Sequence, residues 1–185
     1  MVKTMEKSLY TRLAELVEYP REDIKIKLDE CIKALADYPK YPPEAVEELK
    51  RFQKDMEEIP LDDLQGVYSY TFELTADFTL DLGYHLYDGF KRSGSLSSLK
   101  SMYIAHGFPV DEYAKGELPD HLPVILHFLS MLQDEGLKRD VLESFVIKAM
   151  EKLNKNFHGN MRNIYHHLIS AIYRILDKDV KEEVK

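Results

Sequence analysis

Apolar side chains recur at three- and four-residue spacing along most of the chain. The clearest runs cover residues 9–17, 24–35, 46–56, 142–153 and 161–176. This spacing places apolar side chains on one face of an α-helix. No window shows sustained alternation with a period of two between turn signals, which is the pattern of a half-buried strand. The sequence therefore predicts an all-α fold, a multi-helix bundle.

Two further segments are expected at the centre of this bundle. Residues 121–133 are apolar almost all round, as in a helix that is covered on every side. A helix from Pro60 to roughly Leu82 would carry two apolar faces, and we assign Phe72 and Phe78 to the core. Both segments are predicted to be central helices around which the others pack.

Proline and glycine mark the expected breaks between helices. The breaks are placed at Pro20, residues 38–43, Pro60, residues 89–94, residues 107–119 and Gly136. A chain of 185 residues has the size of one domain, so we predict a single helical domain over residues 1–185. The last charged residues, 178–185, are expected to form a frayed tail.

Composition and charge narrow the function. Hydrophobic residues make up 44% of the chain and charged residues 31%, as in a folded soluble protein. The formal net charge of −8 disfavours a nucleic-acid partner and favours a basic peptide. The N-terminal residues lack the apolar region of an export signal, and the longest uncharged apolar run is shorter than the roughly 20 residues of a membrane span. We expect a cytoplasmic protein without membrane insertion.

Cys31 is the only cysteine in the chain, so the sequence offers no pair for an intrachain disulfide. It falls on an apolar helical position, and we expect it to be a small core residue.

The most informative segment runs from Glu117 to Pro123. Pro119 biases the residue before it away from helical angles, and Asp120 is a good N-cap whose carboxylate would accept the amide two residues later. The helix is then predicted to begin at His121, with Pro123 in its first turn, where the missing N–H costs nothing. One interpretation is a capped helix start only. The other is a rigid corner that presents acidic and imidazole groups for binding.

Three segments, taken together, resemble a known family. They are GELPDHLP at 116–123, VYSYTFELT at 67–75, and GYHLYDGFKRSG at 83–94 followed by Tyr103. The first is similar to the Glu-x-Pro-Asp-His segment of the assembly chaperones for molybdenum oxidoreductases. The second resembles the Tyr-x-x-Thr-Phe-Asp-Leu-Thr run of the nitrate reductase delta-subunit branch, and the third its aromatic loop and basic turn. The segments occur in the family's order across residues 67–130.

The sequence also departs from that pattern at three places. Glu73 stands where the branch usually carries Asp, and Asp88-Gly89-Phe90 replaces a turn similar to Gly-Asp-Thr. His127 lies where an acidic residue is often found. These differences indicate a different client peptide or a different subbranch within the same family.

The resemblance implies a system-specific cytoplasmic chaperone and not an enzyme. Such a protein binds the N-terminal segment of a molybdoenzyme catalytic subunit, often one with a twin-arginine leader. It assists cofactor insertion and assembly before export or membrane docking. The implied chaperone needs no cofactor of its own. We expect a monomer, with a dimer formed by helix swapping as the alternative.

We predict a peptide-binding groove between the corner at 117–123 and the aromatic helix at residues 68–72. Tyrosines at a groove edge offer apolar faces and hydroxyl groups to a bound segment, and an acidic rim orients a basic peptide. The expected contacts are Tyr68, Tyr70, Tyr84, Tyr87, Glu117, Asp120 and His121. The basic turn Lys91-Arg92 is interpreted as a solvated loop, with contact to the client's acidic surface as the alternative.

The sequence lacks the usual short motifs for catalysis and metal binding. None of the seven histidines has a Glu three residues before it, as a di-iron bundle requires, and the chain has no His-Glu-x-x-His pair or glycine-rich phosphate loop. His158, His166 and His167 look like a metal cluster, but adjacent helical residues point about 100° apart. We predict surface or boundary histidines and no metal. A small helical metal- or nucleotide-binding enzyme that uses Asp120 and His121 remains the alternative function, and a permanent oligomer subunit a third.

Overall fold

The computed structural model describes residues 7–182, and within this range the fold is all-α, as predicted. Extended pairing among these residues is limited to one isolated antiparallel bridge between Asp81 and His121. The α-helices are α1 (Leu9–Val17), α2 (Ile24–Ala36), α3 (Pro43–Met56), α4 (Leu61–Tyr68), α5 (Gly89–Ala105), α6 (Val110–Ala114), α7 (Leu122–Met131), α8 (Glu135–Val141), α9 (Ile147–Phe157) and α10 (Tyr165–Glu182). The π-helical turns are η1 (Ser69–Glu73) and η4 (Leu142–Val146), and the 3₁₀ turns are η2 (Ala76–Phe78) and η3 (Leu82–His85).

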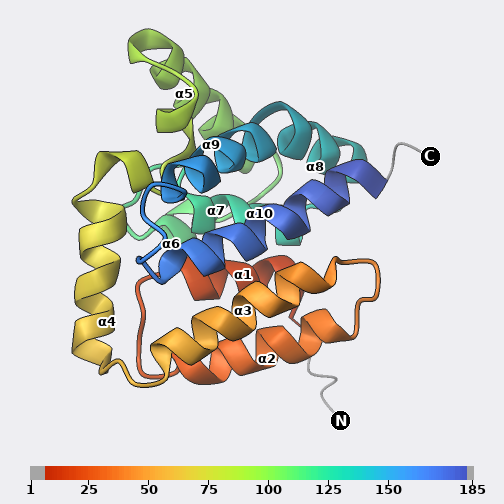
Figure 1. The fold of residues 1–185 in the computed structure, drawn as a ribbon. Coiled ribbons are helices and arrows are strands. Elements are labelled where there is room, and N and C mark those ends of the chain that lie inside the picture. Colours follow the sequence, from red (N-terminus) through yellow and green to blue (C-terminus); the bar gives the residue numbers. More distant parts are fainter. Residues whose placement is uncertain (1–6, 183–185) are drawn as a thin grey trace.

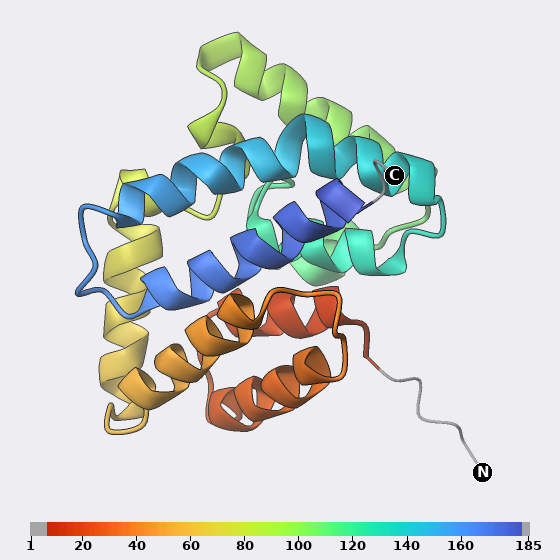
Figure 2. The same cartoon turned by 45° about the vertical axis from the view of Figure 1, so that its right-hand side comes forward.

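The helices stack in a regular order (Figure 1). The helix α3 packs against α2 on one side and α10 on the other, and α10 packs in turn against α9. The helix α1 bridges α2 and the central α7. Figure 2 shows α4 crossing one end of this stack, with α5 at the top. Segments far apart in the sequence are therefore neighbours, and the region after α4 reaches the start of α7.

The core sits where the sequence places it. Every residue of α7 from Leu122 to Leu129 is buried, which confirms this helix as a central one. Phe72 and Phe78 are buried, as expected, and so is Cys31, where burial raises the pKa of the thiol to about 12. No helix among residues 7–182 is long and apolar enough to cross a membrane.

The helix predicted from Pro60 to Leu82 is wrong in its second half. Regular helix ends at Tyr68 and passes into the π-turn η1, after which the chain leaves helical geometry. The Thr71 hydroxyl donates to the Val67 carbonyl at 2.6 Å, and the Thr75 hydroxyl donates to the Tyr70 carbonyl at 2.8 Å. Bonding of a hydroxyl back to its own chain weakens and bends a helix, and it coincides here with the change from α-helix to π-turn.

Three predicted breaks contain helices instead. The break at residues 89–94 is the first turn and a half of α5, and the break at 107–119 contains α6. Gly136 lies inside the first turn of α8, whose N-cap Asp134 accepts the Leu137 amide at 2.9 Å. A glycine in a helix costs only about 1 kcal/mol relative to alanine, and the surrounding residues offset that cost.

The expected frayed tail is also a correction, because α10 continues to Glu182. The Asp179 carboxylate accepts hydrogen bonds from the Tyr10 hydroxyl at 2.7 Å, the Lys40 ammonium at 2.7 Å and the Tyr41 hydroxyl at 3.0 Å. These contacts hold the last turns of α10 against α1 and the loop before α3. Residues 183–185 of the predicted tail lie outside the described residues.

Candidate functional site

The corner at residues 117–123 is anchored from two sides. Backbone hydrogen bonds of 2.8 and 2.9 Å join residues 80–82 to residues 120–122, which makes the antiparallel bridge. The Tyr103 hydroxyl donates to the Pro119 carbonyl at 2.6 Å, and its ring is fully buried. The start of α7 is thus fixed by two segments that precede it in sequence, a loop and a helix.

Asp120 does not cap α7, contrary to the prediction. The N-cap is His121, whose side chain makes no capping bond, and helical residues begin one position later with Pro123 in the first turn as expected. The Asp120 side chain is fully buried and accepts the Gly83 amide at 2.9 Å. The Arg92 guanidinium lies 3.6 Å from the same carboxylate oxygen. Asp120 therefore holds the corner from inside the protein and is not exposed at its surface.

Arg92 lies in the first turn of α5 and not in a solvated loop. Its guanidinium is 3.4 Å from the Asp81 carboxylate as well as 3.6 Å from that of Asp120. Burial raises the pKa of the Asp120 carboxyl, and the nearby Asp81 charge adds to the increase, while Arg92 and the Gly83 amide oppose it. The group forms a charge network behind the corner.

His121 faces outward from this network. Its Nδ1 lies 2.9 Å from a carboxylate oxygen of Asp81 and 3.9 Å from one of Glu117. A carboxylate only accepts, so Nδ1 carries the hydrogen, and in the neutral ring Nε2 keeps its lone pair. His121 is thus an oriented acceptor at the surface of the corner, with the exposed Glu117 beside it.

An open groove of about 160 Å³ lies beside the corner. Its charged residues are three acids and two bases, with His121 between them: Glu18, Glu73, Glu117, Arg21 and Lys115. Three aromatic side chains complete most of the wall: Tyr19, Tyr68 and Tyr113. The groove therefore combines aromatic surface with charges of both signs, and the acids outnumber the bases.

Tyr68 forms the inner part of this wall. It is 4% exposed, and its hydroxyl donates to the Val17 carbonyl at 3.1 Å. Its ring meets those of Tyr19, Phe72 and Tyr165 edge to face, with centroids 5.0 to 5.7 Å apart. Tyr68 offers the groove little more than a ring edge, because its hydroxyl already has a partner inside the protein.

The structure brings three of the seven predicted site residues to the groove, namely Tyr68, Glu117 and His121. Tyr70 and Tyr84 are exposed, at 62% and 43%, but do not line it. The Tyr87 ring stacks on that of Phe145, with centroids 6.3 Å apart, beside a different hollow under α5.

Several groove residues escaped the sequence-based prediction. Glu18, Tyr19 and Arg21 come from the end of α1 and the loop after it, and Tyr113 and Lys115 from the end of α6. No short motif marks these positions, since α1 meets α7 only through a contact between segments about 100 residues apart. Lys115 has a weak sequence signal, because the glycine after it, Gly116, is typical of a helix end. In the structure Lys115 is the C-cap of α6 and has a left-handed backbone, φ 50°.

His127 has a structural partner at the base of the groove. Its Nε2 lies 2.9 Å from a carboxylate oxygen of Glu18, and both side chains are largely covered. Burial alone would raise the pKa of Glu18, but the hydrogen bond and charge of His127 lower it below the ordinary value. This chain thus has His127 where the family often carries an acid, and His127 favours the charged form of Glu18.

Two groups of side chains have the residue types and spacing to hold a metal ion. Asp81, Glu117 and His121 each offer a ligand atom within 4.8 Å of the others at the corner. Glu48, His166 and His167 do the same between α3 and α10. The second group contradicts the expectation that adjacent helical histidines cannot face one point, because their ring centroids are 3.7 Å apart.

The described residues thus form a helical bundle with a groove that carries aromatic side chains and charges of both signs. Residues 39–167 match the family model described as the nitrate reductase delta subunit. The chain belongs to this family.

The relatives agree with that assignment. The chain is 30% identical over 131 residues to the nitrate reductase molybdenum cofactor assembly chaperone NarJ of Escherichia coli strain K12, and likewise to that of E. coli O157:H7. The match covers 68% of this chain and 54% of the relative, so the chain spans about half the length of the curated relatives it matches.

These findings confirm the resemblance on which the sequence interpretation rests. Both relatives are named as nitrate reductase molybdenum cofactor assembly chaperones. Of the two residues named for the alternative enzyme, Asp120 is fully buried and His121 lies at the groove.

Proposed function

We propose that this protein is an assembly chaperone for a molybdenum oxidoreductase and that its groove binds the N-terminal segment of the catalytic subunit. The proposal has support from the family and from the relatives named as molybdenum cofactor assembly chaperones. The observation that carries it is the groove itself, which lies between the corner at 117–123 and two aromatic side chains, Tyr19 just after α1 and Tyr68 at the end of α4.

The groove suits a segment that carries both basic and apolar residues. Glu73 and Glu117 are exposed, so arginine or lysine side chains of the segment pair with them at the rim. The half-exposed ring of Tyr19 offers apolar surface to neighbouring residues. His121 Nε2 accepts a hydrogen bond from the bound backbone or side chain, because Asp81 holds the ring with Nδ1 as donor.

The other predicted contacts take different parts in this proposal. Asp120 is a positioning residue, which holds the corner through Gly83 and the Arg92 network. The exposed Tyr70 and Tyr84 contact parts of the client beyond the segment in the groove. Tyr87 contributes to the hollow beneath α5, on a separate surface.

In the proposed cycle the chaperone keeps the catalytic subunit in the cytoplasm until its molybdopterin cofactor has been inserted. A twin-arginine leader supplies the basic residues that the acidic rim pairs with, and release precedes export or membrane docking. The chaperone acts as a single-domain monomer without a cofactor of its own. Sedimentation velocity measures that state directly, and a stable dimer would contradict it.

Calorimetric titration with a synthetic peptide of the catalytic subunit's N-terminal segment tests the proposal. We expect Glu117→Ala combined with His121→Ala to weaken binding by about tenfold or more, since two charge-assisted contacts are lost. The matched control is Glu112→Ala, an exposed acid of α6 that does not line the groove, with unchanged affinity expected. Equal affinity for the double variant and the unchanged protein would show that the segment binds elsewhere.

A further inference from the structure

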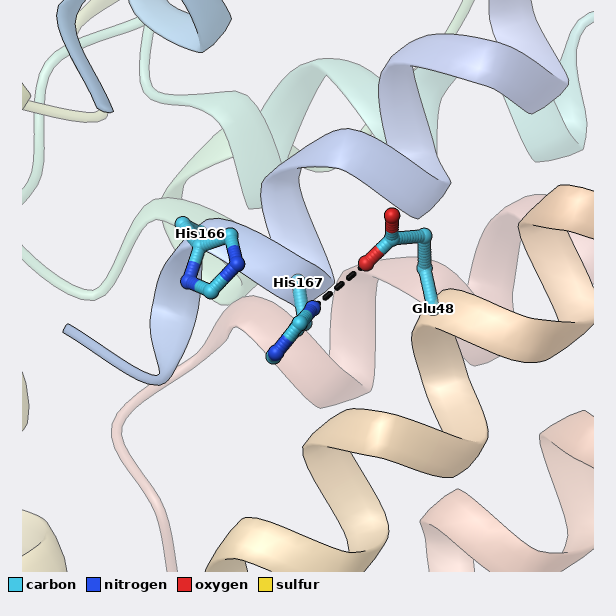
Figure 3. A group of neighbouring side chains, drawn as sticks. All are labelled: Glu48, His166 and His167. Carbon is cyan, nitrogen blue, oxygen red and sulfur yellow. Dashed lines mark hydrogen bonds and ion pairs between the residues drawn. The ribbon is translucent and has the colours of Figure 1, made fainter. Parts of the chain in front are cut away.

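A second cluster of polar side chains does not line the groove. His166 and His167 project from the first turn of α10, and Glu48 of α3 lies opposite them (Figure 3). The three side chains each offer a ligand atom within 4.8 Å of the others. His166 is only 8% exposed, and the side chains of His167 and Glu48 are 13% and 15% exposed. The cluster is therefore largely shielded from water.

The two imidazoles are oriented by their neighbours. His166 Nδ1 donates to the Asn163 carbonyl at 2.7 Å, and a carbonyl can only accept. The hydrogen is therefore on Nδ1, and Nε2 keeps a lone pair. A backbone carbonyl that orients a histidine in this way is the usual outer partner of a metal-bound imidazole.

His167 lies between two carboxylates of α3. Its Nδ1 is 2.5 Å from an oxygen of Glu48, and its Nε2 is 3.4 Å from an oxygen of Asp55. Arg51 is the cation beside this group, 3.9 Å from the other oxygen of Glu48. The carboxylates supply negative charge on both sides of the ring, which favours a bound cation.

We propose that Glu48, His166 and His167 form a binding site for a divalent first-row transition metal of the zinc class, with Asp55 orienting His167 through its other ring nitrogen. Two imidazoles and one carboxylate are a common ligand set for zinc and its neighbours. Calcium and magnesium prefer mainly oxygen ligands, so they fit this set less well.

The geometry requires only local adjustment. Metal–ligand bonds of about 2.0–2.2 Å in a tetrahedral arrangement place ligand atoms about 3.4 Å apart. The ligand atoms of the group lie within 4.8 Å of one another, so they must close in, whereas His167 must move away from the oxygen 2.5 Å from it. The metal takes the place of the hydrogen that His167 shares with Glu48, and that proton leaves to solvent.

A metal here would tie α3 to α10, two helices that pack along their length. The site also adjoins Asn163, whose side-chain amide donates to the Thr71 hydroxyl of η1 at 2.6 Å. Metal binding therefore stabilises the contact between the segment that leads into α10 and η1. The inference does not depend on the proposed peptide groove.

Titration of the purified full chain with Co²⁺ alone, followed by visible absorption, tests the site. Coordination by nitrogen and oxygen ligands gives the d–d bands of bound cobalt, and we expect saturation at one equivalent with displacement by Zn²⁺. His166→Gln and His167→Gln should each weaken cobalt binding about tenfold or more. Glu48→Gln removes the carboxylate while leaving both imidazoles, and it should have the same effect.

The matched control is His158→Gln, an exposed histidine outside the ligand group, for which unchanged cobalt binding is expected. Circular dichroism melting establishes that each variant folds. Absence of cobalt bands in the unchanged protein would overturn the proposal and leave His167 as a hydrogen-bonding partner of the α3 carboxylates. Loss of the bands in His121→Gln, with the other variants unaffected, would overturn it by placing the metal at the corner.

Discussion

The carboxylate of Asp120 is an acid in the interior of the protein. Its side chain is fully buried, and one of its oxygens, Oδ1, has no hydrogen-bond partner among residues 7–182. Burial raises its pKa above the ordinary value of an aspartate, and the charge of Asp81 adds to that increase. The folded protein therefore binds a proton at Asp120 more tightly than the unfolded chain does.

This raised pKa fixes the sign of a pH effect. The contribution of Asp120 to stability is fully present below the ordinary aspartate pKa and is lost as pH rises through the folded-state pKa. Asparagine has nearly the same shape and cannot ionise. We expect Asp120→Asn to gain stability relative to the unchanged protein between pH 4 and pH 7, by on the order of 1 kcal/mol. Urea unfolding of both proteins across that range measures the difference.

The conservative exchange also separates charge from hydrogen bonding. The side-chain oxygen of asparagine still accepts the Gly83 amide, so the corner keeps its anchor. A difference in unfolding free energy that stays constant from pH 4 to pH 7 would mean that Asp120 has an ordinary pKa in the folded protein.

At the scale of single residues, the sequence was sufficient for side chains whose positions depend only on the residues next to them in the chain. Glu117 and His121 sit at the surface of the corner, and Pro123 falls in the first helical turn. Asp120 has the residue type of an N-cap, but the amide that it accepts belongs to Gly83, 37 residues earlier in the chain. A local pattern cannot show which of two available amides a carboxylate will meet.

At the scale of elements, the contact between η3 and the start of α7 depends on close approach of the two segments. A Cβ atom added at Gly83 would lie 2.5 Å from the Asp120 oxygen that accepts the Gly83 amide. Real Cβ contacts are longer than this, so a side chain here must push the two segments apart. Glycine at this position allows the buried carboxylate to sit directly on the loop.

We therefore expect Gly83→Ala to lower the free energy of unfolding by about 1–3 kcal/mol through overpacking. The matched control is Gly94→Ala in α5, where an added Cβ meets nothing within 4 Å. That exchange should raise stability by up to about 1 kcal/mol, because alanine favours a helix over glycine. Urea unfolding of both variants gives the comparison, and equal stability of Gly83→Ala and the unchanged protein would contradict the close approach.

Element boundaries show where periodicity is sufficient. The helices α1, α2, α3 and α7 fall where the apolar spacing predicts them, because each has one long face or an entire surface to bury. The end of α4 could not be predicted in this way. It depends on Thr71, which donates to its own helix and accepts from Asn163, a residue 92 positions later. The start of α5 was missed because its glycines lower the stability of the helix by less than its other residues raise it.

At the scale of the whole molecule, the last helix closes the stack onto its first elements. Asp179 near the end of α10 accepts hydrogen bonds from Tyr10 of α1 and from Lys40 and Tyr41 in the loop before α3. Its side chain is 13% exposed, so water replaces these donors poorly. Charge alone makes residues 178–185 resemble a solvated tail, since the partners of Asp179 lie about 140 to 170 positions away in the sequence.

The final turns of α10 should therefore carry much of the stability of the assembled stack. We expect Asp179→Ala to lower the free energy of unfolding by about 2–4 kcal/mol, because two tyrosine hydroxyls and an ammonium lose a charged acceptor. The matched control is Asp177→Ala, two residues earlier, whose partner Lys181 is exposed on the same helix. An exposed pair at this spacing contributes about 0.5 kcal/mol or less. Thermal or urea unfolding distinguishes the two variants, and an equally small effect for both would make the end of α10 a passive extension of the helix.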